Sequence, residues 1–196
     1  MRVALFGGSF DPVHQGHLVV AEVLRHVERL DRVVFVPAWR SPHKGRSVAG
    51  PEDRLAMLRL AVRGNPAFRI SDVELRQSRP SYTIDTIRTW RARSGERPTL
   101  LLGGDALLDL PSWRQWLDIV AEARLVVFAR PGAARARRRA TALGLHYHEL
   151  VLSSVSSSSI RSLLGRQISV RYQVPDLVRR YIEAHGLYGW RRRRRA

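Results

Sequence analysis

Two kinds of apolar pattern alternate along the chain. Short continuous apolar runs are typical of strands buried on both faces, and an apolar residue at every third or fourth position is typical of an amphipathic helix. We expect strands over residues 1–6, 32–37, 68–71, 99–102, 125–129 and 147–150. We expect helices over residues 17–30, 51–63, 82–93, 106–110, 113–122, 135–143, 159–164 and 175–185. Apolar strands that alternate with helices predict an α/β fold, a Rossmann-like open parallel sheet with helices on both faces.

Residues at the ends of these segments support the expected boundaries. Pro51 suits the first turn of a helix, which Gly64-Asn65-Pro66 then ends. Ser81 is expected to cap the helix that starts at residue 82. In the segment 113–122, Trp113 and Trp116 are three residues apart, so we expect them on one helical face, with one of them in the core.

The segment after the first strand holds the clearest candidate chemistry. An open parallel sheet binds ligands beyond the carboxyl ends of its strands, and residues 7–17, GGSFDPVHQGH, stand there. Gly7 and Gly8 allow the backbone to approach a ligand, and the start of the next helix attracts phosphate. His14 and His17 are three residues apart, which puts both imidazoles on one face of a helical turn.

This segment matches neither common phosphate-binding motif. It lacks the GK[ST] ending of a P-loop and the G-x-G-x-x-G fingerprint of dinucleotide sites. A zinc site would need a third ligand besides the two histidines, and Asp11 is the nearby candidate. A glycine turn followed by two surface histidines is the plain structural alternative.

Length and composition set the class of protein. The 196 residues, 44% of them hydrophobic, suit one domain over residues 1–189, followed by a basic tail at 190–196 that we expect to be disordered. The chain has no cysteine, which excludes disulfides, thiolate metal sites and cysteine catalysis. No apolar run approaches the roughly 20 residues of a membrane span, and no signal-peptide pattern follows the first apolar patch. We therefore expect a cytoplasmic protein that does not contact a membrane.

The formal net charge of +17 favours a nucleic-acid partner at first sight. Lys44 is the only lysine, however, and this preference for arginine resembles the codon composition of a GC-rich genome. Much of the excess lies in two clusters, at Arg135–Arg139 and Arg191–Arg195. We expect these clusters to give non-specific nucleic-acid affinity, and a nucleic-acid-binding protein stays an alternative function.

Residues 153–161, SSVSSSSIR, have two readings. A serine-rich stretch is typical of a flexible linker. A strand is expected before this run and a short helix within its end, so the run can equally be a second phosphate-binding turn.

Several motifs in order resemble one enzyme family. GGSFDPVHQGHL resembles the H-x-G-H signature of the nucleotidyltransferase superfamily. Downstream follow SPHK at 41–44, Arg54 and Met57 in an R-x-x-M pattern, SYTIDT at 81–86, GGD at 103–105, PSW at 111–113, ARPG at 129–132, VSSSSIR at 155–161 and RYQVPDLVRRYIEAHGLYG at 171–189. This set is similar to the bacterial nicotinate-nucleotide adenylyltransferase family over nearly the whole chain, to about Gly189.

The resemblance implies adenylyl transfer from ATP to nicotinate mononucleotide, which gives deamido-NAD and pyrophosphate in NAD biosynthesis. The implied catalytic residues are His14, His17 and Arg161. The implied ATP-binding residues are Gly7, Gly8, Ser9, Phe10, Gly16, Gly103, Asp105, Arg130, Gly132, Ser157 and Ser158. The implied residues for the mononucleotide are His43, Lys44, Tyr82, Thr83, Trp113 and Arg114. Mg²⁺ is expected to arrive with ATP, without a dedicated protein site.

Alternatives stay open at this point. A related adenylyltransferase acting on nicotinamide mononucleotide or phosphopantetheine would share most of these motifs. Asp105 could instead cap the helix that follows it, and Thr83 could cap its own helix. Arg54 could meet a phosphate or pair with another residue of its helix. The sequence does not decide the oligomeric state.

Overall fold

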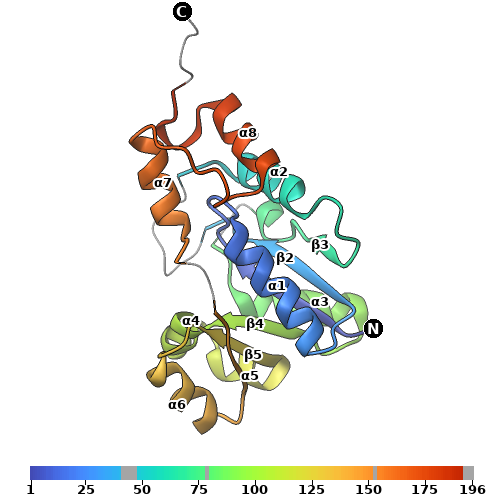
Figure 1. The fold of residues 1–196 in the computed structure, drawn as a ribbon. Coiled ribbons are helices and arrows are strands. Elements are labelled where there is room, and N and C mark those ends of the chain that lie inside the picture. The colour runs from blue at the N-terminus through green and yellow to red at the C-terminus, as the bar shows by residue number, and fades with distance from the viewer. Residues whose placement is uncertain (41–47, 78–79, 152–153, 192–196) are drawn as a thin grey trace, which may run out of the picture.

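A parallel sheet forms the centre of the computed structural model, which describes residues 1–40, 48–77, 80–151 and 154–191 (Figure 1). Within these residues the sheet has six strands in the order β3-β2-β1-β4-β5-β6, and every paired neighbour runs parallel. The strands are β1 (Val3–Gly8), β2 (Arg32–Pro37), β3 (Phe68–Ile70), β4 (Thr99–Gly103), β5 (Arg124–Ala129) and β6 (His146–Glu149). The predicted Rossmann-like sheet is confirmed.

Helices cover both faces of the sheet. One face carries α1 (Gln15–Val27) and α2 (Pro51–Val62). The same core is extended by α7 (Ser157–Gly165) and by α8 (Asp176–His185), which lies beside α2 (Figure 1). The other face carries α3 (Thr83–Ser94), α4 (Gly104–Asp109), α5 (Trp116–Glu122) and α6 (Ala134–Ala142). Three short 3₁₀ turns complete the described elements: η1 (Leu75–Gln77), η2 (Leu110–Ser112) and η3 (Leu187–Gly189).

The alternation of side chains along each strand creates two cores. Ala4 and Phe6 of β1 pack into the first core, under α1, while Val3 and Leu5 pack into the second, under α3 and α4. All four are buried. Because both faces of the strand must be apolar, β1 reads as a continuous apolar run in the sequence, and β2, β4 and β5 do so for the same reason.

The strand order reverses between β1 and β4. Strand β2 lies on one side of β1 and β4 on the other, so the sheet extends in opposite directions from this point. Ligands of open parallel sheets bind in the crevice beyond the carboxyl ends of the strands at such a reversal. The ends of β1 and β4, at Gly8 and Gly103, therefore mark where a ligand would bind.

Most of the predicted helix starts differ from the structure by one to three residues, and three of them show why. Helix α1 begins at Gln15, with His14 as the preceding cap residue, rather than at residue 17. Helix α7 begins at Ser157 rather than 159, because Ser156 caps it. Helix α3 is preceded by Tyr82 without a side-chain cap, and the Ser81 hydroxyl instead accepts a hydrogen bond from the main-chain N–H of Trp39.

Helix α5 is shorter than predicted. Gln115 has a left-handed backbone (φ 53°) that separates the helix from the residues before it. Trp113 is extended (φ −79°, ψ 144°), so it does not share a helical face with Trp116. Both tryptophans are half-buried against the second core, and neither is fully inside it.

The fold extends past the predicted boundary at Gly189. Trp190 packs against the first core, and the main-chain N–H of Arg191 donates to the Gln167 side chain at 2.9 Å. The remaining tail residues, 192–196, lie outside the described residues. Among the described helices, none is long and apolar enough to cross a membrane.

Candidate active site

The loop that leaves β1 is built around a buried phenylalanine. Phe10 is 2% exposed, has a left-handed backbone (φ 48°), and meets the His17 ring edge-on at 5.1 Å between centroids. A Cβ atom on Gly8 would lie 3.0 Å from the Phe10 ring, whereas one on Gly7 would meet nothing within 4 Å. Gly8 thus makes room for Phe10, Gly7 leaves open space, and the Phe10 side chain supports His17 from the core.

The two histidines form a stacked pair at the start of α1. Their ring centroids are 3.7 Å apart and their planes differ by 26°. The main-chain N–H of His14 donates to Nδ1 of His17 at 3.2 Å. Because Nδ1 accepts, a neutral His17 carries its proton on Nε2 and is a hydrogen-bond donor there.

His14 is the more buried member of the pair, at 8% exposed. Burial lowers its pKa to about 4, and the positive charge of Arg130 adds to this effect. His14 is therefore neutral at pH 7. Arg130 directly follows β5. Because its charge acts on His14, the ends of β1 and β5 lie at the same site.

Gly16 is needed beside the His14 ring. A Cβ atom at this position would lie 3.1 Å from both Cε1 and Nδ1 of His14. That separation is tighter than ordinary van der Waals contact, so a methyl group here would displace the imidazole.

The serine run is the start of a helix, and it closes over the same loop. Ser156 accepts from the Ser159 N–H at 3.1 Å, and the Ser159 hydroxyl in turn accepts from the Ser156 N–H, which forms a capping box. The Ser157 hydroxyl donates to the main-chain oxygen of Pro12 at 2.9 Å. The linker reading of residues 156–159 is wrong.

Arg161 extends from the first turns of α7 toward the loop after β1. Its Nη1 donates to the main-chain oxygen of Asp11 at 2.7 Å, and its Nη2 donates to the Ser158 hydroxyl at 3.3 Å. The N-termini of α1 and α7 therefore lie at one loop, and each presents the partial positive charge of a helix start to an anion.

The two glycines at the end of β4, Gly103 and Gly104, serve the packing of a helix as well as the approach of a ligand to the backbone. Gly103 is the cap residue of α4 without a side-chain bond, so the alternative that Asp105 caps this helix is wrong. Asp105 is exposed in the first turn. A Cβ atom on Gly104 would lie 3.0 Å and 3.1 Å from the Cβ atoms of Ala129 and Ala136, so this glycine lets α4 pack closely on β5 and α6. After β5, Gly132 has a left-handed backbone (φ 85°) that favours glycine.

Four of the six residues predicted for the mononucleotide lie at the start of α3 and in the segment before α5. The Arg114 guanidinium lies 4.9 Å from the centre of the Tyr82 ring, which joins the start of α3 to the segment before α5. Trp113 is the neighbour of Arg114 and is half-buried. Thr83 is the first residue of α3 and makes no cap hydrogen bond, so its predicted capping role is wrong.

Buried Glu74 supports this half of the site from below. It accepts a hydrogen bond from the Thr86 hydroxyl and interacts with the Ser81 side chain. Burial raises the pKa of its carboxyl group. Ser81 also accepts from the Trp39 N–H, so the start of α3 is tied to the loop after β2.

His43 and Lys44 lie outside the described residues, but the residues on either side of them are firmly held. Val48 and Ala49 donate their main-chain N–H groups to the two carboxylate oxygens of Asp11, at 2.8 and 3.1 Å. On the amino-terminal side, the main-chain oxygens of Ala38 and Trp39 accept hydrogen bonds from Arg54, which is fully buried and also donates to the main-chain oxygen of Ser9. Both predicted roles for Arg54, phosphate contact and pairing on its own helix, give way to this bracing of two loops.

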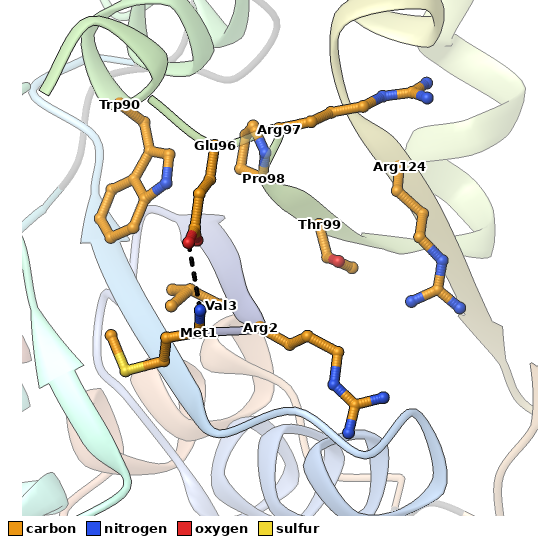
Figure 2. A pocket seen from close by; sticks show the side chains of 9 residues that line it. All are labelled: Met1, Arg2, Val3, Trp90, Glu96, Arg97, Pro98, Thr99 and Arg124. Atoms are coloured by element: carbon orange, nitrogen blue, oxygen red, sulfur yellow. Dashed lines mark hydrogen bonds and ion pairs between the residues drawn. The ribbon is translucent and has the colours of Figure 1, made fainter. Parts of the chain in front are cut away.

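Two further observations concern a metal site and a cavity among the described residues. Within the described residues, no group of three or more His, Asp or Glu side chains is arranged to hold a metal ion, so the zinc alternative on His14, His17 and Asp11 has no support. A cavity of about 390 Å³ lies elsewhere, at the amino ends of β1, β4 and β5 (Figure 2). Its lining includes Trp90, Arg124 and Glu96, which bonds the Met1 ammonium at 3.1 Å. It is at the opposite edge of the sheet from the histidines.

Comparison with known proteins agrees with this geometry. The cytidylyltransferase-like family model matches residues 5–163. A protein of Roseiflexus sp. named "Probable nicotinate-nucleotide adenylyltransferase" is 44% identical over 193 residues, covering 95% of this chain and 97% of that protein. A Thermus thermophilus protein of the same name is 43% identical over 189 residues, covering 96% and 100%. The chain belongs to the nicotinate-nucleotide adenylyltransferase family.

The fold of this nicotinate-nucleotide adenylyltransferase family member is also similar to a solved structure. It is that of Plasmodium falciparum nicotinic acid mononucleotide adenylyltransferase complexed with NaAD, with a TM-score of 0.80 and 19% identity over 97% of this chain and 98% of that one. At this identity the likeness supports the fold alone. Asp11 as an anchor and Glu74 are site-supporting residues that sequence reasoning missed, because only folding brings their partners together.

Proposed function

We propose that the chain transfers the adenylyl group of ATP to nicotinate mononucleotide, which yields deamido-NAD and pyrophosphate. One observation carries the proposal: His14 and His17 at the start of α1, and Ser158 and Arg161 at the start of α7, converge on the loop after β1. That loop lies at the reversal in strand order, where open parallel sheets bind nucleotides. The names of relatives at 44% and 43% identity support the same reaction.

The proposed reaction is a direct in-line displacement. A phosphate oxygen of the mononucleotide attacks the α-phosphorus of ATP, the new P–O bond forms, and the bond to the leaving pyrophosphate breaks. The nucleophile is already an anion, so the enzyme needs no strong base. Catalysis then consists of bringing two anions together and stabilising charge on the phosphoryl oxygens.

The side chains suit this role. A neutral His14 and a neutral His17 with its proton on Nε2 are hydrogen-bond donors to phosphate oxygens, and Arg161 supplies a fixed positive charge. We assign Gly7, Gly8, Ser9, Gly16 and Ser157 to the lining of the same phosphate site. Mg²⁺ enters with ATP as part of that substrate, since magnesium commonly binds through the phosphates it accompanies.

The remaining ATP contacts are assigned to the ends of β4 and β5. Asp105, which is exposed, is assigned to the ribose hydroxyls, and the main chain of Arg130 and Gly132 to adenine. Gly103 is assigned to the ATP site beside them. Phe10 contributes through its backbone, because its side chain is in the core.

Nicotinate mononucleotide is assigned to the residues at the start of α3 and in the segment before α5. Trp113 would stack on the pyridine ring, and main-chain N–H groups near Thr83 and Arg114 would bind the nicotinate carboxylate. The positive charge of Arg114, held over Tyr82, favours an acid over an amide at this place. Roles for His43 and Lys44 stay predictions, as does a cytoplasmic location.

A pyrophosphate-release assay with ATP tests the proposal, using nicotinate mononucleotide, nicotinamide mononucleotide and phosphopantetheine as acceptors. We expect the highest kcat/KM with nicotinate mononucleotide. Equal values for the acid and the amide would overturn the acid preference, and a preference for phosphopantetheine would overturn the proposed substrate.

The same assay tests the phosphate site. Loss of one donor to a developing charge commonly lowers kcat by roughly a hundredfold to a thousandfold, so His17→Ala should do so. Near-normal turnover in this variant would remove His17 from the mechanism. Its unfolding curve serves as the control for folding.

A further inference from the structure

We propose that Tyr188, on the η3 turn after the last helix, is a positioning residue for the phosphate side of the active site. It acts by holding the carboxylate of Asp11, which keeps the Arg161 guanidinium available to ATP. The inference rests on the proposed function, because it assigns Arg161 to ATP.

The contact between Tyr188 and Asp11 is buried and joins opposite ends of the chain. The Tyr188 hydroxyl donates to Oδ1 of Asp11 at 2.8 Å, and the two residues are 9% and 4% exposed. Burial and the adjacent negative charge of Asp11 raise the pKa of Tyr188 above its usual value, so the hydroxyl stays protonated and remains a donor.

Asp11 stands at a junction of three other segments. Its carboxylate accepts the N–H groups of Val48 and Ala49, which follow the undescribed residues 41–47. Its main-chain oxygen accepts from Nη1 of Arg161, and Oδ2 lies 3.9 Å from the same nitrogen. Asp11 therefore connects the loop after β1, the segment before α2, the start of α7 and the η3 turn.

The Asp11 carboxylate and the nucleotide compete for the Arg161 guanidinium, because Oδ2 of Asp11 lies 3.9 Å from Nη1 of Arg161. A carboxylate satisfied by Tyr188, Val48 and Ala49 has little need of another donor, and Arg161 bonds the Asp11 main chain and Ser158 instead. Without the Tyr188 hydroxyl, Oδ1 keeps only the Ala49 N–H among its described partners. The carboxylate is then free to rotate and shorten its 3.9 Å contact with Arg161 into a hydrogen-bonded ion pair, which withdraws the positive charge from the nucleotide.

The η3 turn is shaped to present Tyr188 inward. Gly186, Tyr188 and Gly189 all have left-handed backbones, with φ of 61°, 59° and 78°. A side chain as large as tyrosine seldom adopts this conformation. Gln167, which directly follows α7 and its cap residue, donates to the main-chain oxygen of Gly189 at 2.8 Å and so fixes the turn against the helix that carries Arg161.

Tyr188→Phe tests the inference, because it removes the hydroxyl and keeps the ring. Tyr181→Phe is the matched control. Its hydroxyl donates to Oδ1 of Asp53 at 2.9 Å, so it is another Tyr–Asp bond of the C-terminal segment, and it joins α8 to α2. Both variants lose a hydrogen bond to a carboxylate, and Tyr188→Phe should lose more thermal stability because its bond is the more buried of the two.

The expected difference is in nucleotide binding. Tyr188→Phe should weaken MgATP binding, measured by calorimetry, on the order of tenfold and raise KM for ATP in step. KM for nicotinate mononucleotide should change less than twofold. Tyr181→Phe should change neither constant more than twofold.

Asp11→Asn provides the second test. If Tyr188 acts through Asp11, adding Tyr188→Phe to Asp11→Asn should change the MgATP Kd less than twofold further, and additive losses would overturn the inference. Equal effects of Tyr188→Phe and Tyr181→Phe on the MgATP Kd would also overturn it. The binding measurement needs no turnover, so it stays informative even if the intact protein fails to release pyrophosphate, which is the result that would overturn the proposed function.

Discussion

A buried imidazole at the entrance of α1 has consequences for both chemistry and stability. Nδ1 of His14 is buried and has no hydrogen-bond partner among the described residues. A buried polar atom without a partner costs free energy, and such atoms are common where a ligand completes the bonding. At pH 7 His14 is neutral, so its contribution to phosphate binding is a hydrogen bond and not a charge.

The lowered pKa of His14 predicts a loss of stability in mild acid. The pKa is about 4 in the folded protein against 6.5 for the unfolded chain, so the unfolded state binds more protons between these values. The free energy of unfolding should therefore fall as pH falls from about 6.5 to 4, by up to about 3 kcal/mol from this group. Urea unfolding of the wild type and His14→Asn at several pH values measures it.

The difference in unfolding free energy between wild type and His14→Asn should shrink as pH falls, because only the wild type can take up a proton at this position. Parallel pH profiles for wild type and His14→Asn would contradict the assigned burial.

Gly16→Ala should separate stability from activity. Alanine favours an α-helix by about 1 kcal/mol over glycine, and Gly16 lies in the first turn of α1. The new methyl group would stand 3.1 Å from the His14 ring and push it away. We expect unchanged or higher thermal stability together with at least a tenfold lower kcat, since small misplacements of catalytic groups are costly.

Gly165→Ala is the comparison for Gly16→Ala. It is also in a helix, and its nearest contact for a Cβ atom is an ordinary 3.8 Å, so its kcat should stay within twofold of wild type. A Gly16→Ala enzyme with normal turnover would show that the position of the His14 ring is not critical.

At the scale of the element, α7 is the clearest case of a helix whose start is part of the site. The capping box of Ser156 and Ser159 fixes its first turn, and Ser157 and Arg161 then bond the main chain of the loop after β1. The position of Arg161 depends on this cap.

Ser156→Ala should therefore affect both stability and ATP use. Loss of such a cap commonly costs about 1 kcal/mol of unfolding free energy, measured by urea denaturation. We also expect a several-fold rise in KM for ATP, because the first turn of α7 frays. Ser94→Ala is the control, since its hydroxyl bonds the Trp90 main chain at the far end of α3. An equal rise in KM for ATP in both variants would contradict the role of the cap.

Which elements exist was predictable, and where some of them start was not. Continuous apolar runs identified β1, β2, β4 and β5 because their residues face two cores. The start of α5 was missed because a left-handed Gln115 carries no sequence signal. Ser81 has the chemistry of a cap, but the Trp39 N–H from another loop takes its hydroxyl. Tertiary contacts of this kind override local preference.

At the scale of the whole molecule, motifs predicted which residues meet, but not what holds them. His14, His17, Ser158 and Arg161 belong to quoted motifs, and the fold brings their segments to one loop. Asp11, Arg54, Glu74 and Tyr188 make contacts with residues that are 12 to 177 positions away in the chain. No local sequence pattern predicts such pairs, because each of these residue types is also common at positions where it makes no such long-range contact.

The positive net charge of the whole molecule predicts salt-dependent binding to RNA. The exposed face of α6 bears Arg135, Arg137 and Arg138, and residues 192–196 contain four more arginines. Binding to phosphate chains by such clusters releases counterions and falls steeply with salt, so RNA affinity should drop at least tenfold between 50 and 200 mM salt. Deleting residues 192–196 should weaken RNA binding and flatten this salt dependence, as measured by fluorescence anisotropy, while pyrophosphate release stays within twofold of wild type. The combined Arg135→Gln and Arg138→Gln variant should act in the same direction. Tight RNA binding that resists salt, in a protein without adenylyl transfer, would instead make nucleic-acid binding the function.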